Sequence, residues 1–383
     1  MSRLESSLRF LLKILLVVSL FAPLIYTSGF IFPYIVPRTV FFQLTTELMA
    51  LFLVPLLVFF PSSRQKRTPL LITVGIFLSL GLLTTFTSAD LVKSWIGTME
   101  RSFGFFHLLH YGVFFLALIT VLKTQQHWFS FLSLSLILSV YSATDFLTAS
   151  YHSQGSVPPS ITGNPTFLAV YLTFHVFFAA WLATHIQKKW LSAGLIPIIA
   201  LLIAAIIATG VRGAFIGLSA SGIFLVGWSV WKFPNSDACR AKQARPKWRI
   251  YLLSGAVVLI GAYFFLFLNR NHELVRHNFI ASRITNFSSQ DSTILSRIAM
   301  WKIALRGLLD RPIVGWGREN YSLVFNAHYD SSFDAAGVSE GWEDRAHNIV
   351  FDELTQGGLL GFLAYLWLLL AAIWTIRREP LLI

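Results

Sequence analysis

Long hydrophobic runs separated by short polar segments make up most of this sequence. A helix needs about 20 residues to cross the hydrocarbon core of a bilayer. The pattern predicts ten such helices, at about 9–28, 39–60, 69–87, 103–122, 128–147, 165–185, 191–209, 213–231, 250–268 and 348–375. Membrane β-strands would instead alternate in polarity over segments of about ten residues, and this sequence does not. We therefore expect an all-α, polytopic membrane protein.

One long polar stretch, residues 269–347, interrupts the hydrophobic runs. Its centre predicts an amphipathic helix, because Asp291 or Ser292 can cap a helix and Pro312 and Gly315 can end it. Apolar residues recur on one face at helical spacing: Ile294, Ile298, Trp301, Leu305 and Leu308. The basic face carries Arg297, Lys302 and Arg306. Such a helix lies on the membrane surface or against the bundle of spans.

The composition supports a membrane protein of three parts. Hydrophobic residues make up 55% of the chain, charged residues 13%, and mean hydropathy is +0.65, whereas soluble domains average about 25% charged residues. Nine spans occupy 1–268, the long loop 269–347, and the last span with a cytoplasmic end 348–383.

The first run lacks a small-residue cleavage signature, as an uncleaved signal anchor does. The single cysteine, Cys239, allows no internal disulfide and gives no metal-site pattern.

The distribution of basic residues predicts the orientation. Lys and Arg gather in alternate short segments, at 3–13, 64–67, 123, 188–189, 232–249 and 377–378. The intervening short loops hold only Arg38, Lys93, Arg101 and Arg212. Since basic loops stay cytoplasmic, we expect the amino terminus in the cytoplasm and the stretch 269–347 outside it. The net charge of +12 then serves contact with anionic membrane lipids, and we expect no nucleic-acid partner.

Two arginines are candidates for binding an anion. Arg212 stands between two apolar runs, with Gly210 and Gly213 close on either side. Glycine lets the backbone approach a ligand closely, and arginine holds phosphate through paired, charge-assisted hydrogen bonds. Arg297, on the predicted amphipathic helix, is the second candidate. Each also has a plainer explanation, Arg212 as an anchor at the membrane boundary and Arg297 as an ordinary basic residue of a surface helix.

His347 is the candidate general base. It lies where the long stretch returns to the membrane, next to Asn348 and after Glu343, Asp344 and Arg345. Histidine titrates near neutral pH and is the commonest general base, although a lone histidine is more often structural. Arg345 can support a bound diphosphate or pair with Asp344, and the sequence leaves both roles open.

Other polar residues fall inside predicted spans. Glu47 and Asp145 are intramembrane carboxylates, which are candidate site residues unless they form a structural pair with an arginine. His107 and His110 share a helix face, but two histidines without a third ligand are a weak metal signal, and interfacial packing is the simpler explanation. No P-loop, GxGxxG, HExxH or GxSxG motif occurs, which argues against an ATP-driven pump.

Three ordered motifs carry a family resemblance. They are VRGAFIGLSASG at 211–222, SRIAMWKIALRGLLDRPIVGWGRENY at 296–321 and AHNIVFDELTQGGLLGFLAYL at 346–366, with weaker echoes at 94–106 and 163–172. In this order and topology they resemble the O-antigen ligase and polymerase superfamily, bacterial membrane glycosyltransferases that use polyprenyl-diphosphate-linked glycans. The ligase-like region covers about 196–370. The sequence departs from the family pattern in two places. Val211 stands where the family often has serine. The chain also ends soon after Arg378, where family members carry further spans, so it is compatible with a partial chain.

The resemblance implies a GT-C-like helical fold and glycan transfer at the periplasmic face of the bacterial inner membrane. The donor would be an undecaprenyl-diphosphate glycan. Arg212 and Arg297 match the family's diphosphate-binding arginines, and His347 matches its catalytic histidine. Candidate supporting residues are Arg345, Asn348, Glu47 and Asp145. With two arginines on the leaving group, we expect an inverting transfer that needs no metal and no other cofactor.

The resemblance leaves the acceptor open. Lipid A–core would make the protein a ligase, a growing glycan would make it a polymerase, and a protein hydroxyl would make it a protein O-oligosaccharyltransferase. A transporter or flippase of lipid-linked glycans is the competing class and would use the same arginines. Such a protein should show repeated halves or broken helices, and neither is clear in the sequence.

Overall fold

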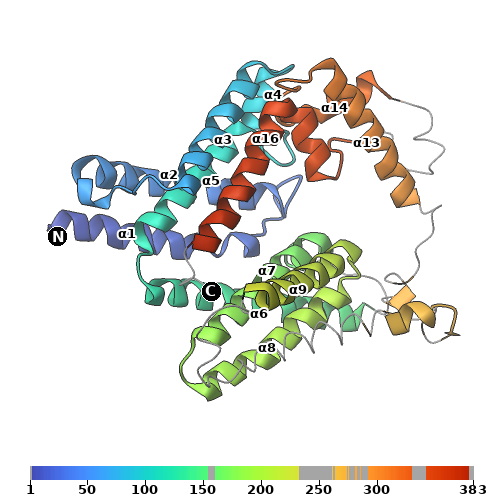
Figure 1. Cartoon of the computed structure of the whole chain (residues 1–383), viewed down its shortest axis with the longest axis horizontal. Helices are drawn as coiled ribbons and strands as arrows, with labels where there is room; N and C mark the ends of the chain where they lie inside the picture. The colour runs from blue at the N-terminus through green and yellow to red at the C-terminus, as the bar shows by residue number, and fades with distance from the viewer. Residues whose placement is uncertain are drawn as a thin grey trace. The chain divides into compact units, whose positions relative to one another are not determined.

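The computed structural model describes residues 2–153, 160–232, 264–273, 292–329 and 342–378, with the single positions 261, 275, 281, 282 and 285. Within these residues every regular element is a helix and no strand occurs. The predicted all-α class is confirmed. Two compact units make up the chain (Figure 1): unit 1 comprises Met1–Trp128 and Ser288–Ile383, and unit 2 comprises Phe129–Phe287.

Seven of the described helices are long and apolar enough to cross a membrane. They are α1 (Arg3–Ser19) with the short helix η1 (Ala22–Leu24), α2 (Val36–Phe59), α3 (Pro69–Phe86), α6 (Gln125–His152), α7 (Pro165–His185), α8 (Lys189–Ala208) and α16 (Ile349–Arg378). Each corresponds to one predicted span, so the multi-pass helical architecture is confirmed.

The other three predicted spans are less simple. The fourth, 103–122, is the shorter apolar helix α5 (Phe105–Val121). The eighth, 213–231, is α9 (Arg212–Lys232), which is not among the seven. The ninth, 250–268, lies mostly outside the described residues. The number of spans in the whole chain therefore stays a prediction.

In unit 1, α16 packs along α3, α1 packs along α2, and α5 contacts all of α1, α2 and α3 (Figure 1). Three further helices contact these spans: α4 (Leu91–Ile96) lies against α3 and α5, whereas α13 (Ser292–Asp310) and α14 (Tyr321–Ala327) lie against α16. In unit 2, α7 packs against α8 and α9. A buried hydrogen bond of 2.7 Å between Ser135 and His175 joins α6 to α7.

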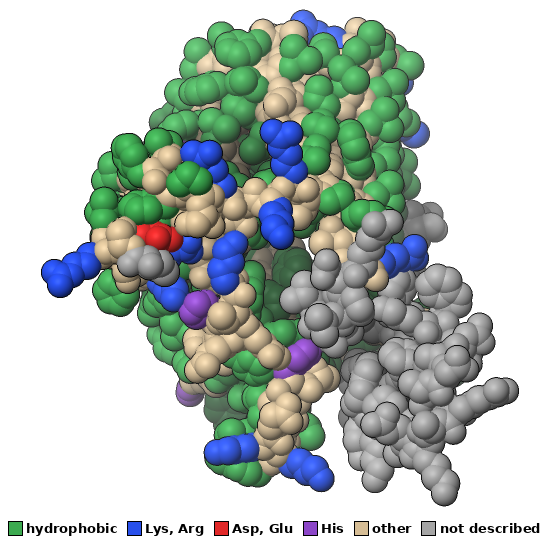
Figure 2. All heavy atoms as spheres, turned by 60° about the vertical axis from the view of Figure 1, so that its left-hand side comes forward, with side chains coloured by type: hydrophobic (Ala, Val, Ile, Leu, Met, Phe, Trp, Pro, Cys, Tyr) green, Lys and Arg blue, Asp and Glu red, His purple; other side chains and the backbone are tan. Residues whose placement is uncertain are grey.

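Polar contacts at one end of unit 1 join segments that the charges assign to the same side. Arg9 donates to Ser63 Oγ at 2.7 Å and to the Thr120 carbonyl at 3.1 Å, and Lys123 donates to Gln65 Oε1 at 2.8 Å. All of these residues lie in or next to segments predicted to be cytoplasmic. On the face drawn in Figure 2, Lys and Arg side chains are visible at several places and carboxylates are few. Which side faces the cytoplasm stays a prediction from the charges.

The predicted amphipathic helix is confirmed as α13, and the residues that it buries inside the protein are not those of the predicted apolar face. Its buried residues include Ser296, Met300, Ile303, Ala304 and Gly307. The expected apolar residues Ile298 and Leu305 are 40% and 46% exposed. Small residues explain the difference, because a Cβ at Gly307 would lie only 2.2 Å from Val324 of α14. α13 therefore packs through the face on which a neighbouring helix can come closest.

The span α16 is broken at Gly358, whose φ of 59° and ψ of −162° are not helical. Two helical hydrogen bonds are lost there, and the turn 312–317 replaces them from both sides. Its N–H groups donate to the freed carbonyls of Thr355 and Gln356 at 2.9 and 2.8 Å, and its carbonyls accept from the freed N–H groups of Leu359 and Leu360 at 2.8 and 3.1 Å. No clear sign of a broken helix is present in the sequence, yet α16 is broken. The break could not be predicted because the turn that compensates for it lies elsewhere in the chain.

We expect Gly358→Ala to lower the free energy of unfolding by about 2 kcal/mol, since this backbone conformation is open essentially only to glycine. The new Cβ would also lie 2.5 Å from the Ile313 carbonyl. Thermal unfolding of the full chain in detergent, followed by tryptophan fluorescence, measures the change. Gly75→Ala in α3 is the matched control, because a Cβ there meets nothing within 4 Å. Equal midpoints for the two variants would contradict the role given to Gly358.

Candidate active site

His347 lies in the loop that leads into α16, and hydrogen bonds fix the residues on both sides of it. Ala346 is fully buried; its N–H donates to Asp352 Oδ1 at 2.8 Å, and its carbonyl accepts from Trp301 Nε1 at 3.1 Å. Asn348 caps α16, because its side-chain oxygen accepts from the N–H two residues ahead at 3.0 Å. His347 itself has a left-handed backbone, with φ 51°. Such conformations persist where the surroundings enforce them, often at functional sites.

Glu343 holds the imidazole of His347. The two side chains meet at 3.3 Å between Nε2 and Oε2, and His347 is 45% exposed whereas Glu343 is 12% exposed. The hydrogen bond to Glu343 raises the pKa of His347 against the opposing effect of burial, and the charges of Glu343, Asp344 and Asp352 raise it further. The result is an accessible imidazole backed by a carboxylate.

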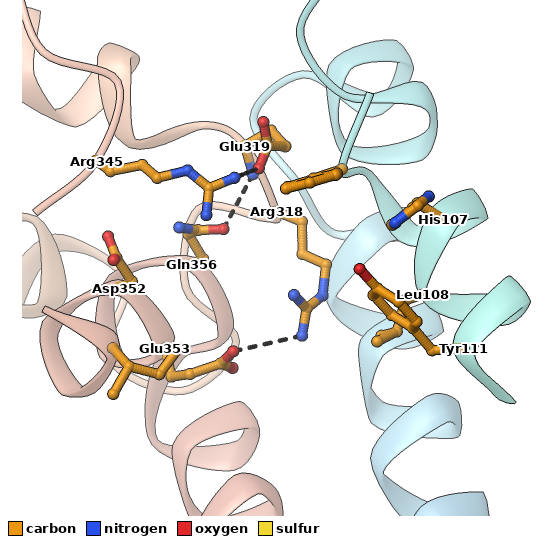
Figure 3. Close-up of a pocket in the computed structure, with 11 residues that line it drawn as sticks. His107, Leu108, Tyr111, Arg318, Glu319, Arg345, Asp352, Glu353 and Gln356 are labelled. Carbon is orange, nitrogen blue, oxygen red and sulfur yellow. Dashed lines mark hydrogen bonds and ion pairs between the residues drawn. The ribbon is translucent and has the colours of Figure 1, made fainter. Parts of the chain in front are cut away.

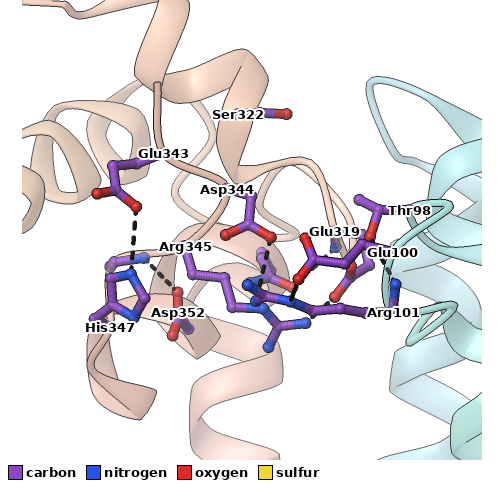
Figure 4. A network of polar contacts seen from close by, with 12 residues as sticks. Thr98, Glu100, Arg101, Glu319, Ser322, Glu343, Asp344, Arg345, His347 and Asp352 are labelled. Atoms are coloured by element: carbon purple, nitrogen blue, oxygen red, sulfur yellow. Dashed lines mark hydrogen bonds and ion pairs between the residues drawn. The ribbon is translucent and has the colours of Figure 1, made fainter. Parts of the chain in front are cut away.

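Ion pairs tie the same loop to two other segments (Figure 4). Arg345 pairs with Glu319, which lies just before α14. Asp344 pairs with Arg101, at 3.2 Å, in the loop before α5. Arg345 thus pairs with Glu319 and not with Asp344, and its support of a bound diphosphate stays a prediction. The Nε atom of Arg345 is buried and has no hydrogen-bond partner.

Arg297 lies near this loop on α13. Its side chain is exposed, and it stands one turn before Trp301, on the same side of the helix. Trp301 hydrogen-bonds Ala346 and stacks on Phe351 of α16 with ring centroids 5.2 Å apart. Four residues along a helix correspond to about 6 Å. The structure thus brings two of the three predicted key residues, Arg297 and His347, into one region of unit 1.

Arg212 belongs to unit 2. It is the first residue of α9 and follows a turn in which Gly210 has a φ of 65°. Its side chain is half-buried. The approach of Arg212 to Arg297 and His347, which the resemblance implies, stays a prediction.

The two carboxylates predicted to lie inside spans have contacts of their own. Glu47 on α2 is 50% exposed and lies 3.3 Å from His110 Nε2 on α5. Asp145 on α6 accepts from the N–H of Ile161 at 3.3 Å. The first contact joins two helices of unit 1, and the second joins α6 to the segment before α7 in unit 2. Among the described residues, no group of three or more His, Cys, Asp or Glu is placed to hold a metal ion.

A polar cavity of about 130 Å³ adjoins the His347 loop in unit 1 (Figure 3). Its polar lining comes from Arg318, Glu319, Arg345, Asp352, Glu353 and Gln356. Its aromatic lining comes from Phe103, His107 and Tyr111. Arg318 pairs with Glu353 at 3.5 Å, and Gln356 Oε1 accepts from the N–H of Glu319 at 3.0 Å. The cavity thus lies between the start of α16 and the region where α5 begins.

Most of these cavity residues were not predicted from the sequence as site residues. One signal was present, because Asp352, Glu353 and Gln356 interrupt the first turns of a hydrophobic span, and polar residues inside spans are candidate site residues. Arg318 and Glu319 gave no such signal. Their partners lie on other segments, and only the fold brings them together.

The chain was compared with models of protein families. Residues 197–366 match the family model described as O-antigen ligase. A search of curated proteins finds no match. The matched region contains Arg212, Arg297 and His347, whereas Glu47 and Asp145 lie before it.

We expect Glu343→Gln to lower the pKa of His347, because the hydrogen bond and charge that stabilise the imidazolium are weakened. The rate of His347 modification by diethyl pyrocarbonate, followed by mass spectrometry as a function of pH, reports this pKa. Neutral imidazole reacts, so the midpoint should move to lower pH. Glu100→Gln is the control, since Glu100 lies 3.6 Å from Arg101 and makes no recorded contact with His347. The same midpoint in both variants would show that Glu343 does not govern the imidazole.

Proposed function

Since this chain belongs to the O-antigen ligase and polymerase superfamily, we propose that it transfers a glycan from undecaprenyl diphosphate to an acceptor hydroxyl at the periplasmic face of the inner membrane. The transfer is inverting and independent of metal. The observation that carries this proposal is the accessible His347 with Glu343 behind it, at the loop that leads into α16. The members of this superfamily are membrane ligases and polymerases of glycans.

The histidine acts as the general base. A hydrogen bond from Nε2–H of His347 to Glu343 leaves Nδ1 with the lone pair that accepts a proton. The acceptor hydroxyl gives up this proton as its oxygen attacks the anomeric carbon. Glu343 then stabilises the imidazolium that forms, so it is a positioning residue for the base. The raised pKa of His347 makes it a stronger base, although it is neutral only above that pKa.

The arginines act on the leaving group. As the glycosidic bond breaks, the diphosphate gains negative charge, and fixed guanidinium groups stabilise the transition state more than the ground state. We assign this role to Arg212 and Arg297. Because the hydroxyl attacks from the side opposite to the diphosphate, the anomeric configuration inverts. Two guanidinium groups on the diphosphate perform the task for which many glycosyltransferases use a divalent cation.

Lipid A–core is the acceptor in our proposal, with a growing glycan or a protein hydroxyl as alternatives within the same chemistry. The break in α16 is the one observation that favours a transporter, because broken helices build the substrate sites of many transporters. However, the backbone groups freed at Gly358 are occupied by the turn 312–317. They are therefore not offered to an ion or substrate, and the transferase is the better supported function.

We expect His347→Ala to lower kcat by about 10² to 10⁴, and Arg212→Ala and Arg297→Ala by about 10² each. Transfer from a defined lipid-linked donor by the purified full chain measures these changes. His127→Ala and Arg64→Ala serve as controls, because His127 bonds Lys13 and Arg64 bonds carbonyls of α2. Retained transfer in the three site variants, at matched expression, would overturn the mechanism.

Chelation gives a separate test of the metal-free mechanism. We expect the transfer rate to stay unchanged after prolonged treatment with EDTA and gel filtration, because guanidinium groups stabilise the diphosphate. A matched measurement after adding back Mg²⁺ or Mn²⁺ should give the same rate. A rate that falls on chelation and returns with the cation would refute the metal-free version and leave the role of His347 standing.

A further inference from the structure

The cavity next to the His347 loop is not used by the mechanism above. It lies within one unit and is bounded by the α16 residues Asp352, Glu353 and Gln356 on one side and by the α5 residues His107 and Tyr111 on the other (Figure 3). A single water needs roughly 10–15 Å³ of such space. A volume of about 130 Å³ therefore suits a polar molecule of several groups better than a lone ion.

The charges of the cavity exclude a diphosphate as its occupant. Arg318 is already paired with Glu353, and Arg345 is already paired with Glu319. A third carboxylate, Asp352, also lines the cavity. Three carboxylates against two guanidinium groups would repel a polyanion. The diphosphate role thus stays with other arginines, and a neutral ligand fits this cavity better.

The same groups suit a ligand that carries many hydroxyls. Carboxylate and amide oxygens of Glu353 and Gln356 accept hydrogen bonds, and the phenol of Tyr111 can both donate and accept. Arg318 and Arg345 line the same cavity, and the guanidinium N–H groups that their ion pairs leave unused can donate to hydroxyls.

Aromatic rings supply the remaining wall. Phe103 stacks on His107 with centroids 4.8 Å apart and an interplanar angle of 23°, and Tyr111 meets His107 edge-on at 4.7 Å. A pyranose ring has apolar C–H faces and hydroxyl edges. Pockets that combine aromatic walls with a few placed polar groups are typical ligand sites. The wall and the polar floor together match both parts of a sugar.

The position of the cavity connects it with the proposed reaction. Arg345 and Ile349, each two residues from His347, both line it. Asp352 lines it as well and accepts the N–H of Ala346, the residue just before His347. A ring held in the cavity would therefore lie close to the candidate base.

We propose that this cavity binds one neutral sugar ring during glycan transfer, from either the acceptor or the donor glycan. The proposal rests on the proposed function for its role in transfer, although binding can be tested without transfer. The ring is held by its hydroxyl edges against the paired ions and by its apolar face against Phe103 and Tyr111.

Saturation-transfer difference NMR on the purified full chain tests binding directly. The probes are the methyl glycosides of glucose, galactose, mannose, rhamnose and N-acetylglucosamine. We expect saturable transfer to at least one of them, with affinity about threefold to tenfold weaker in Tyr111→Phe, which loses one hydrogen bond. Phe103→Leu should weaken binding without any change of charge. No saturable transfer from any probe, or equal affinity in these variants and the wild type, would overturn the proposal.

Matched controls guard against loss of folding. Tyr26→Phe and Phe106→Leu make the same chemical changes at residues that do not line the cavity, and both should bind as the wild type does. Transfer kinetics then identify the source of the ring. Tyr111→Phe should raise the KM of the acceptor if the ring is the acceptor's, or of the donor if it is the donor's, with little change in kcat. Sugar binding by a protein that transfers no glycan would refute the proposed function and leave the cavity assignment standing.

Discussion

A helix break inside a membrane is tolerated only when the backbone groups that it frees find partners, because each unpaired group there costs several kcal/mol. In α16 the turn 312–317 meets this requirement with four hydrogen bonds, two donated and two accepted. The fit needs glycine on both sides: a Cβ at Gly315 would lie 2.5 Å from the Gly358 backbone, and one at Gly358 would lie 2.5 Å from Ile313. Gly315 and Gly358 therefore both allow the turn 312–317 to pair with the broken part of α16.

The pairing of the turn 312–317 with α16 determines where the polar residues near the start of α16 lie. The turn continues directly into Arg318 and Glu319, and pairing of its backbone with Thr355 and Gln356 places both residues beside the first turns of α16. There Arg318 reaches Glu353, and Glu319 reaches Arg345 in the His347 loop. Glu353, a charged residue in a hydrophobic span, therefore has a partner because the break at Gly358 brings the turn 312–317 and Arg318 to that span.

Much of the fold could be predicted from the sequence, and less of the site. Apolar runs located the spans because the bilayer fixes their length, and capping signals located α13. Which residues of α13 are buried could not be predicted, since the close approach at Gly307 depends on a neighbouring helix that the periodicity of α13 does not reveal. His347 could be predicted as a candidate site residue from this one sequence. The partner of Arg345 could not, because Glu319 and Asp344 are equally acidic and only the fold selects between them.

Glu343 and His347 are four residues apart on a single loop, whereas Arg297 belongs to a helix and Arg212 to the other unit. A shift of the loop would carry the imidazole and its carboxylate together. The contact with Glu343, which has the largest effect on the pKa of the imidazole, would then be kept while the distance of the imidazole from the guanidinium groups changed. In the proposed mechanism, the strength of the base therefore depends mainly on one loop, whereas its alignment with the arginines depends on the rest of the fold.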